Sequence, residues 1–126
     1  MGHEDFLKQA AEAKTRIKQV SSDEAEKIGD RPNALILDVR EAAEYQQAHL
    51  LNAVNVSLSQ LEQEIQEIVP DKSTPIVCYC AGGNRGALAA DTLNKMGYTN
   101  AVSIEGGLKA WESSGKATID TTEANS

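Results

Sequence analysis

The sequence is poor in cysteine and histidine, and this shortage excludes several kinds of protein. Its 126 residues include two cysteines and two histidines. Cys78 and Cys80 are separated by one residue, so a disulfide between them would close a strained ring and stabilise no loop. We therefore expect reduced thiols. A metal site built on Cys-x-Cys is also disfavoured, because two further ligands are not apparent in the sequence.

The sequence also lacks any apolar run long enough to cross a bilayer. Its first 14 residues contain neither the basic region nor the apolar region of a signal peptide. Together with the reduced cysteines, these two absences predict a cytoplasmic protein that has no membrane partner.

Basic residues are outnumbered by acidic ones, 12 to 19, which gives a formal net charge of −7 at pH 7. General nucleic-acid binding needs a basic face that neutralises phosphates. An anionic membrane surface likewise attracts basic segments rather than acidic ones. The charge balance therefore argues against both as partners. No apolar patch is evident either, and we expect a monomer.

The composition is that of a folded domain, with 40% hydrophobic and 25% charged residues. A chain of this length suits one compact domain. Residues 1–14 are polar, alanine-containing and helix-prone, and we expect an N-terminal helical extension there. Residues 118–126 are polar and small, which predicts a flexible C-terminal tail. The domain itself is expected over residues 15–117.

Strand and helix signals alternate along the chain. Apolar runs predict strands at residues 16–20, 34–39, 53–56, 76–79 and 101–104. Helices are predicted from Ser21 or Ser22 onward and at residues 41–47, 58–69, 85–96 and 108–113. This alternation is typical of an α/β fold with a mainly parallel central sheet of about five strands flanked by helices. In such sheets, sites form beyond the carboxyl ends of the strands.

Cys80 comes directly after the strand at residues 76–79 and opens a glycine-bearing loop. The loop continues through Ala81, Gly82, Gly83, Asn84 and Arg85. Because glycine accepts positive φ, successive N–H groups can converge there as an anion nest, at the positive end of the next helix dipole. Such a nest stabilises the thiolate, the nucleophilic form of cysteine. Cys78 lies mid-strand in the apolar run, and we expect it to be a core residue.

Five parts of the chain carry a resemblance to a known family. They are residues 37–41 with Glu44 and Tyr45, His49 with Ala53, residues 79–85, residues 96–98, and residues 105–107 with Ala110 and Trp111. In this order and spacing, the chain resembles the single-domain rhodaneses, a family of sulfurtransferases, over roughly residues 16 to 115. The resemblance implies a rhodanese-like three-layer fold.

The resemblance also implies a reaction. Cys80 would attack a sulfur donor, keep the outer sulfur as a persulfide, and give it to a thiol or cyanide acceptor. The amides of residues 81–85 would cradle the persulfide, and no metal or organic cofactor would be needed. Arg85 resembles the family's loop-closing arginine, which holds the loop's shape and raises the local positive potential. The alternative for Arg85 is an arginine at a helix start paired with a surface acid.

Asp38 and Arg40 resemble the family's Asp-x-Arg, which implies support of the site rather than participation in the chemistry. We expect Asp38 to accept hydrogen bonds and Arg40 to pair with Glu44 or another acid. His49 matches the family's histidine before the next strand, and we expect it to be structural. Trp111 is expected in the core.

The chain departs from the family pattern at three places. Residues 48–53 differ in the turn after the histidine, and Gly86 stands where a serine is common. Ala81 and Gly82 supply no basic residue after the cysteine. The last departure predicts that thiosulfate is not an efficient physiological donor, although slow turnover with it is expected.

Three other classes compete with a sulfurtransferase. Phosphatase-like and arsenate-reducing relatives need five residues between cysteine and arginine, whereas four lie between Cys80 and Arg85. A cysteine protease needs a histidine base, and nothing in the sequence places His3 or His49 beside Cys80. The serious rival is a non-enzymatic persulfide relay or protein-binding module of the same fold. A relay would be loaded by a partner such as a cysteine desulfurase, and the sequence leaves this alternative open.

Overall fold

A computed structural model describes residues 2–120 and shows a five-stranded sheet with every strand pair parallel. The strands occur in the spatial order β1-β5-β4-β2-β3. Their bounds are Lys18–Val20 (β1), Leu35–Asp38 (β2), Val54–Asn55 (β3), Ile76–Tyr79 (β4) and Ala101–Ile104 (β5). The predicted α/β fold is confirmed, and β4, which precedes Cys80, is the central strand.

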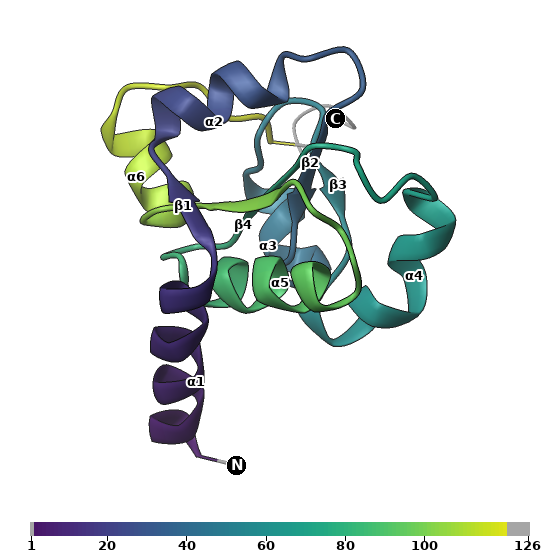
Figure 1. Cartoon of the computed structure of the whole chain (residues 1–126). Helices are drawn as coiled ribbons and strands as arrows, with labels where there is room; N and C mark the ends of the chain where they lie inside the picture. The colour runs from purple at the N-terminus through teal and green to yellow at the C-terminus, as the bar shows by residue number, and fades with distance from the viewer. Residues whose placement is uncertain (1, 121–126) are drawn as a thin grey trace.

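Helices cover both faces of the sheet and make three layers (Figure 1). They are α1 (His3–Arg16), α2 (Ser22–Gly29), α3 (Ala42–Gln47), the 3-10 helix η1 (Leu58–Gln60), α4 (Leu61–Ile68), α5 (Asn84–Lys95) and α6 (Gly107–Ser113). Apolar side chains of α4 and α5 pack in one core cluster, and those of α2 and α6 pack in a second cluster on the opposite face. The predicted three-layer arrangement is therefore present.

The central strand explains the continuous apolar run in the sequence. Ile76 and Cys78 point into one core cluster, while Val77 and Tyr79 point into the other. A strand with helices on both sides buries alternate residues on opposite faces, so polar alternation disappears. Cys78 has no exposed surface, which confirms its predicted place in the core.

Helix starts follow local capping chemistry where the sequence supplies it. The Ser21 hydroxyl accepts a hydrogen bond from the Glu24 N–H at 3.1 Å and caps α2, which resolves the choice between Ser21 and Ser22. The helix predicted over residues 58–69 is instead a 3-10 turn followed by α4, and Leu61 and Ile65 are its buried residues.

The N-terminal helix ends two residues later than predicted and packs on the domain. It ends at Arg16, so β1 begins at Lys18 rather than at residue 16. Ala10 and Ala13 are fully buried, and α1 contacts α5 along this face. Arg16 donates two hydrogen bonds to Asp91 of α5, at 3.1 and 2.8 Å. Residues 1–14 are thus not separate from the fold.

The chain beyond α6 returns to the domain. Ile119 and His49 exchange two backbone hydrogen bonds, at 2.8 and 2.9 Å. Residues 118–120, predicted as part of a flexible tail, are therefore paired with the segment after α3. The remainder of that predicted tail, residues 121–126, lies outside the described residues.

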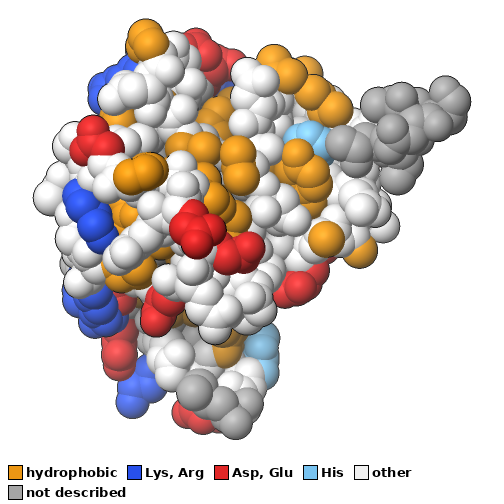
Figure 2. All heavy atoms as spheres, turned by 90° about the vertical axis from the view of Figure 1, so that its right-hand side faces the viewer, with side chains coloured by type: hydrophobic (Ala, Val, Ile, Leu, Met, Phe, Trp, Pro, Cys, Tyr) orange, Lys and Arg blue, Asp and Glu red, His pale blue; other side chains and the backbone are white. Residues whose placement is uncertain are grey.

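Large hydrophobic side chains that face solvent come from separate parts of the chain. Leu7 in α1, Leu51 after α3 and Ile68 in α4 are the exposed ones among the described residues. Figure 2 shows hydrophobic side chains at several places on one face, with acidic side chains between them. Over residues 2–120, no helix is both long and apolar enough to cross a membrane.

Ser103 in β5 offers a test of core packing. Its side chain is fully buried, and its Oγ has no hydrogen-bond partner among the described residues. A buried hydroxyl without a partner costs about 1–3 kcal/mol. Ser103→Ala should therefore raise the free energy of unfolding, measured in urea, by about 1 kcal/mol.

The matched control is Ser114→Ala, which removes a hydroxyl that donates to the Trp111 carbonyl at 2.7 Å. This variant should leave the free energy of unfolding unchanged or lower it slightly. A loss of stability in Ser103→Ala would show that the Ser103 hydroxyl is bonded after all.

Candidate active site

Three loops meet at the carboxyl end of the sheet, around Cys80. β4 ends at Tyr79, directly before Cys80, and β2 ends at Asp38, which is in register with Tyr79. β5, on the other side of β4, ends at Ile104 and is followed by the Gly106–Gly107 turn. Parallel strands bring their carboxyl ends to one edge, so these loops are neighbours although they are far apart in sequence.

Cys80 is held inside its own loop. Its Sγ accepts a hydrogen bond from the Gly83 N–H at 3.1 Å, and only 1% of the residue is exposed. Gly83 has φ +109°, a left-handed conformation that an L side chain rarely adopts. The predicted inward turn of the loop is thus present at Gly83, and its N–H favours an anionic sulfur. Because Cys80 is so little exposed, a donor must approach through the rim of the loop.

The Gly106–Gly107 turn braces the loop from the β5 side. The N–H groups of Leu108 and Lys109 donate to the carbonyls of Cys80 and Ala81, at 2.8 and 3.0 Å. A Cβ on Gly107 would overlap the Cys80 carbonyl oxygen and lie 2.8 Å from that of Ala81. The sequence placed residues 105–107 among the parts that resemble the family, but it assigned Gly106 and Gly107 no contact with the Cys80 loop. Two adjacent glycines one residue after the end of a strand were the available signal that another backbone approaches closely.

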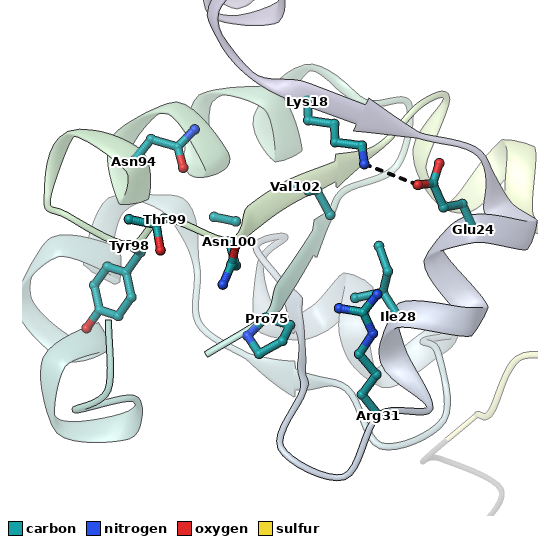
Figure 3. Close-up of a pocket in the computed structure, with 11 residues that line it drawn as sticks. Lys18, Glu24, Ile28, Arg31, Pro75, Asn94, Tyr98, Thr99, Asn100 and Val102 are labelled. Carbon is teal, nitrogen blue, oxygen red and sulfur yellow. Dashed lines mark ion pairs between the residues drawn. The ribbon is translucent and has the colours of Figure 1, made fainter. Parts of the chain in front are cut away.

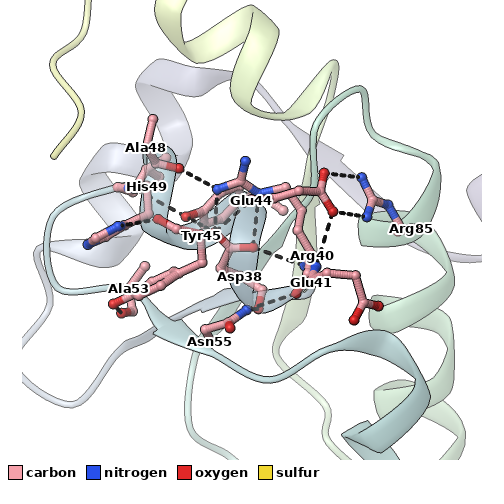
Figure 4. A network of polar contacts seen from close by, with 12 residues as sticks. Asp38, Arg40, Glu41, Glu44, Tyr45, Ala48, His49, Ala53, Asn55 and Arg85 are labelled. Atoms are coloured by element: carbon pink, nitrogen blue, oxygen red, sulfur yellow. Dashed lines mark hydrogen bonds and ion pairs between the residues drawn. The ribbon is translucent and has the colours of Figure 1, made fainter. Parts of the chain in front are cut away.

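Asp38, at the end of β2, is a fully buried carboxylate at the centre of a polar network (Figure 4). Its Oδ1 accepts hydrogen bonds from the backbone N–H and the Nε of Arg40, at 2.9 and 3.1 Å. Its Oδ2 accepts from Arg40 Nη2 at 2.8 Å and from the Tyr79 hydroxyl at 2.6 Å. Arg40 also donates to the Ala48 carbonyl. Arg40 was expected to pair with Glu44 or another acid, and in the structure it pairs with Asp38.

Tyr79 ties this ion pair to the strand that carries Cys80. Its hydroxyl accepts a hydrogen bond from the Leu50 N–H at 3.1 Å while donating to Asp38. Burial, the Asp38 charge and the hydrogen bond to Asp38 raise the pKa of Tyr79 far above its usual value, so the phenol stays protonated. The Arg40 guanidinium also lies 5.7 Å from the centre of the Tyr79 ring. The predicted supporting role of Asp38 and Arg40 fits these contacts.

Arg85 reaches from α5 to α3 and forms a two-pronged pair with Glu44 (Figure 4). Nη1 and Nη2 lie 2.7 and 3.0 Å from the two carboxylate oxygens. The hydrogen bond from Arg85 is the main cause that lowers the pKa of Glu44. The same hydrogen bond is the main cause that raises the pKa of Arg85, with a smaller attraction to Cys80. Arg85 therefore anchors the loop to α3 and has its charge matched by a carboxylate.

The other cysteine and the nearby histidine have structural places. Burial raises the pKa of the Cys78 thiol far above its usual value, with a smaller effect from Cys80, so Cys78 stays a neutral thiol. His49 stacks on Tyr45 with ring centres 3.8 Å apart, and its Nδ1 lies 2.8 Å from the Tyr45 carbonyl oxygen. The predicted structural roles of Cys78 and His49 fit these contacts, and that neither residue reacts stays a prediction.

A polar cleft of about 430 Å³ lies at the other end of the sheet (Figure 3). It is lined at the start of strands by Lys18, Pro75 and Ala101, and it contains the Lys18–Glu24 ion pair at 3.3 Å. Cys80 is at the opposite end of the sheet, one full strand away. The cleft is therefore not part of the candidate site, in spite of its size. Among residues 2–120, no group of three or more His, Cys, Asp or Glu side chains could hold a metal ion.

The comparisons with known proteins agree with this geometry. The sequence pattern of the Rhodanese-like domain matches residues 21–114, and the chain belongs to this family. The protein YqhL of Bacillus subtilis (strain 168), itself uncharacterized, is 41% identical over 96 residues, which cover 76% of this chain and 74% of YqhL. Thiosulfate sulfurtransferase PspE of Escherichia coli (strain K12) is 40% identical over 73 residues, which cover 58% of this chain and 69% of PspE.

A solved structure gives the same result for the fold. The protein RPA3614 of Rhodopseudomonas palustris CGA009, of unknown function and described as a possible tyrosine phosphatase, superposes with a TM-score of 0.80 at 28% identity. The match covers 90% of this chain and 93% of that one. The rhodanese-like fold is therefore present over almost the whole chain.

Gly107 tests the bracing of the Cys80 loop. Gly107→Ala places a Cβ against the Cys80 and Ala81 carbonyls at φ +59°. We expect a loss of about 1–3 kcal/mol in the free energy of unfolding and a displaced loop. The loop displacement should appear as a changed rate of Cys80 alkylation, measured by peptide mass spectrometry on the folded protein.

Gly115→Ala is the matched control, because Gly115 has φ +85° but nothing within 4 Å of the added Cβ. It carries similar backbone strain without the contact, and it should leave Cys80 alkylation unchanged. Equal effects of the two substitutions on Cys80 would show that contact with the loop is not the cause.

The Arg85–Glu44 pair predicts a dependence of stability on pH. The folded-state pKa of Glu44 lies below its ordinary value of 4.5, so the pair stabilises the fold above that value. This contribution is lost as the pH falls through the lower folded-state pKa. Glu44→Gln should lower the free energy of unfolding at pH 7 by up to about 1 kcal/mol, since the pair is partly exposed. The difference should be smaller at acidic pH than at pH 7, because the contribution is lost as the pH falls through the folded-state pKa of Glu44 and the wild-type carboxylate is protonated.

Urea denaturation at both pH values measures the effect. The control Glu62→Gln changes an exposed glutamate of α4 for which the described residues show no ion pair. A stability difference for Glu44→Gln that persists in acid would mean that the charge of Glu44 is not the source.

Proposed function

We propose that this protein is a sulfurtransferase that carries a sulfane sulfur as a persulfide on Cys80. The observation that supports this most directly is the Gly83 N–H, which lies 3.1 Å from Cys80 Sγ in a loop at the carboxyl end of the central strand. A hydrogen-bond donor in this position stabilises negative charge on Cys80 Sγ and on a sulfur bound to it. A fixed N–H is therefore suited to both the thiolate and the persulfide.

The first half-reaction loads the loop. The Cys80 thiolate attacks the outer sulfur of the donor, and a new S–S bond forms at Sγ. With thiosulfate, the S–S bond of the donor breaks and its electron pair leaves on sulfite. The charge is conserved, because a thiolate and a thiosulfate dianion become a persulfide anion and a sulfite dianion.

The second half-reaction empties the loop. A thiolate or cyanide attacks the outer sulfur of the persulfide and forms a bond to it. The bond between that sulfur and Cys80 Sγ breaks, and its electron pair returns to Cys80 as the thiolate. No net oxidation of the protein occurs, so neither a redox cofactor nor a metal is part of the proposal.

The relationship to PspE supports thiosulfate as one donor, since that protein is named a thiosulfate sulfurtransferase. A protein donor is the alternative, because Ala81 and Gly82 carry no charge that would attract thiosulfate. In that case the protein relays a persulfide between partners. Slow transfer of sulfur to Cys80 from thiosulfate, together with fast transfer from a cysteine desulfurase that carries a persulfide, would favour the relay.

A phosphatase function has less support, although the neighbour RPA3614 is described as a possible tyrosine phosphatase. Only four residues separate Cys80 from Arg85, which makes a narrow ring for a tetrahedral oxyanion. Arg85 also gives both terminal nitrogens to Glu44, so its guanidinium fork does not face a ligand in the loop. These contacts favour sulfur transfer over phosphoryl transfer.

The proposal is tested by intact-protein mass spectrometry after brief incubation with thiosulfate. The wild type should gain one sulfur atom, and Cys80→Ser should gain none, because it lacks the thiolate. Cys78→Ser, the same change two residues earlier, should still gain sulfur while losing stability, because it buries a hydroxyl in an apolar strand.

Thermal melting checks that each variant is folded. Equal loss of sulfur loading in folded Cys78→Ser would overturn the division of roles between the cysteines. A wild type that gains sulfur from neither thiosulfate nor a loaded desulfurase would rule out the sulfurtransferase and leave a binding module.

A further inference from the structure

The N-terminal helix α1 lies outside the residues that match the family but reaches the candidate site. The family match begins at residue 21, whereas α1 ends at Arg16. α1 contacts α5, and its carboxyl end lies near the start of α5 in Figure 1. Since α5 begins directly after the Cys80 loop, the end of α1 is placed beside that loop.

Lys14 makes the contact between α1 and the loop. Its Nζ donates a hydrogen bond to Asn84 Oδ1 at 2.8 Å. Asn84 follows Gly83, whose N–H donates to Cys80 Sγ. The path from Lys14 Nζ to Cys80 Sγ therefore passes through two neighbouring residues, Asn84 and Gly83. Because consecutive Cα atoms are about 3.8 Å apart, the distance between Nζ and Sγ is on the order of 10 Å. A unit charge at this distance acts on an anion at the rim, because it is within about one Debye length.

Lys14 adds a cation beside a loop whose own cation is paired. Arg85 is the single cation of residues 80–85, and Glu44 neutralises it with two hydrogen bonds. By contrast, the described residues place no carboxylate within ion-pair distance of Lys14; its partner is the neutral amide of Asn84. Ala10 and Ala11, which precede Lys14 by four and three positions on the same helix face, carry no charge. The positive charge of Lys14 is therefore uncompensated.

The location of this charge does not serve the stability of α5. Carboxylates stabilise a helix N-terminus, and cations there add to the positive end of the dipole. The first turn of α5 contains no acidic residue. Lys14 thus reinforces a positive potential that the helix start already creates, which favours an incoming anion.

We propose that Lys14 is a specificity-determining residue of the Cys80 site, which attracts and positions small anionic sulfur donors such as thiosulfate. This inference rests on the proposed sulfur transfer and adds the class of donor. Lys14 acts from the rim by charge, and Arg16, paired with Asp91, holds the end of α1 in place for it.

The kinetic test compares thiosulfate loading of wild type, Lys14→Gln and Lys14→Arg. Lys14→Gln should raise the KM for thiosulfate about three- to tenfold with little change in kcat, because a charge at this range acts on binding. Lys14→Arg should restore most of the lost affinity. The difference between wild type and Lys14→Gln should shrink in high salt, which screens exposed charges.

The matched control is Lys8→Gln, which removes a charge from an exposed position of the same helix. It lowers the net charge equally, and it should leave the KM unchanged. Circular dichroism and thermal melting of each variant establish that α1 remains folded. An unchanged KM in Lys14→Gln, or an equal rise in Lys8→Gln, would overturn the proposal.

A second readout is independent of sulfur transfer. Anionic iodoacetate and neutral iodoacetamide both alkylate cysteine thiolates, and the ratio of their rates at Cys80 measures the local potential. Lys14→Gln should lower the iodoacetate-to-iodoacetamide ratio at Cys80 several-fold, and Lys8→Gln should not. A lowered ratio in a protein that accepts no sulfur from any donor would reject the proposed function while supporting the charge effect. An unchanged ratio would reject the role of Lys14.

Discussion

The buried carboxylate of Asp38 is the group to which the structure around Cys80 is tied. Asp38 is the last residue of β2 and pairs with Arg40, two residues later. It also accepts a hydrogen bond from the hydroxyl of Tyr79 in β4. Burying an ion pair costs several kcal/mol per ion, and the attraction repays this only where the remaining hydrogen bonds are made. Both oxygens of Asp38 have at least two partners, which meets that condition. The pair is best understood as a positional device, because it fixes Tyr79 and hence the residue that follows it.

The Cys80 loop itself has few contacts of its own and is held from three sides. Gly107 and the start of α6 hold its carbonyls, Glu44 of α3 holds Arg85, and Lys14 of α1 holds Asn84. A loop of six residues would otherwise lose its geometry to conformational entropy, which costs about 1–2 kcal/mol per residue to restrain. These contacts with neighbouring elements keep the Gly83 N–H directed at Cys80 Sγ.

The fold and the position of Cys80 could be predicted because their signals are local. The apolar run at residues 76–79 and the glycines after it define a buried strand and a loop, whatever surrounds them. The partners of Arg40 and Arg85 could not be assigned. Asp38 and Glu44 lie two and four positions from Arg40, so both were within reach, and Glu44 lies 41 positions from Arg85. The contact of Lys14 with Asn84, 70 positions away, depends on packing between elements, which no local pattern encodes.

The absence of a basic residue at Ala81 and Gly82 led to the expectation that thiosulfate is a poor donor, and α1 changes the basis for that expectation. The charge at a site is a property of the space around it, so a cation from another helix can replace one within the loop. Such a division separates two tasks. The loop residues fix the chemistry, because they contact sulfur, and a helix outside the family match sets the potential at the rim. Donor preference could then change through α1 while the geometry of the Cys80 loop stays intact.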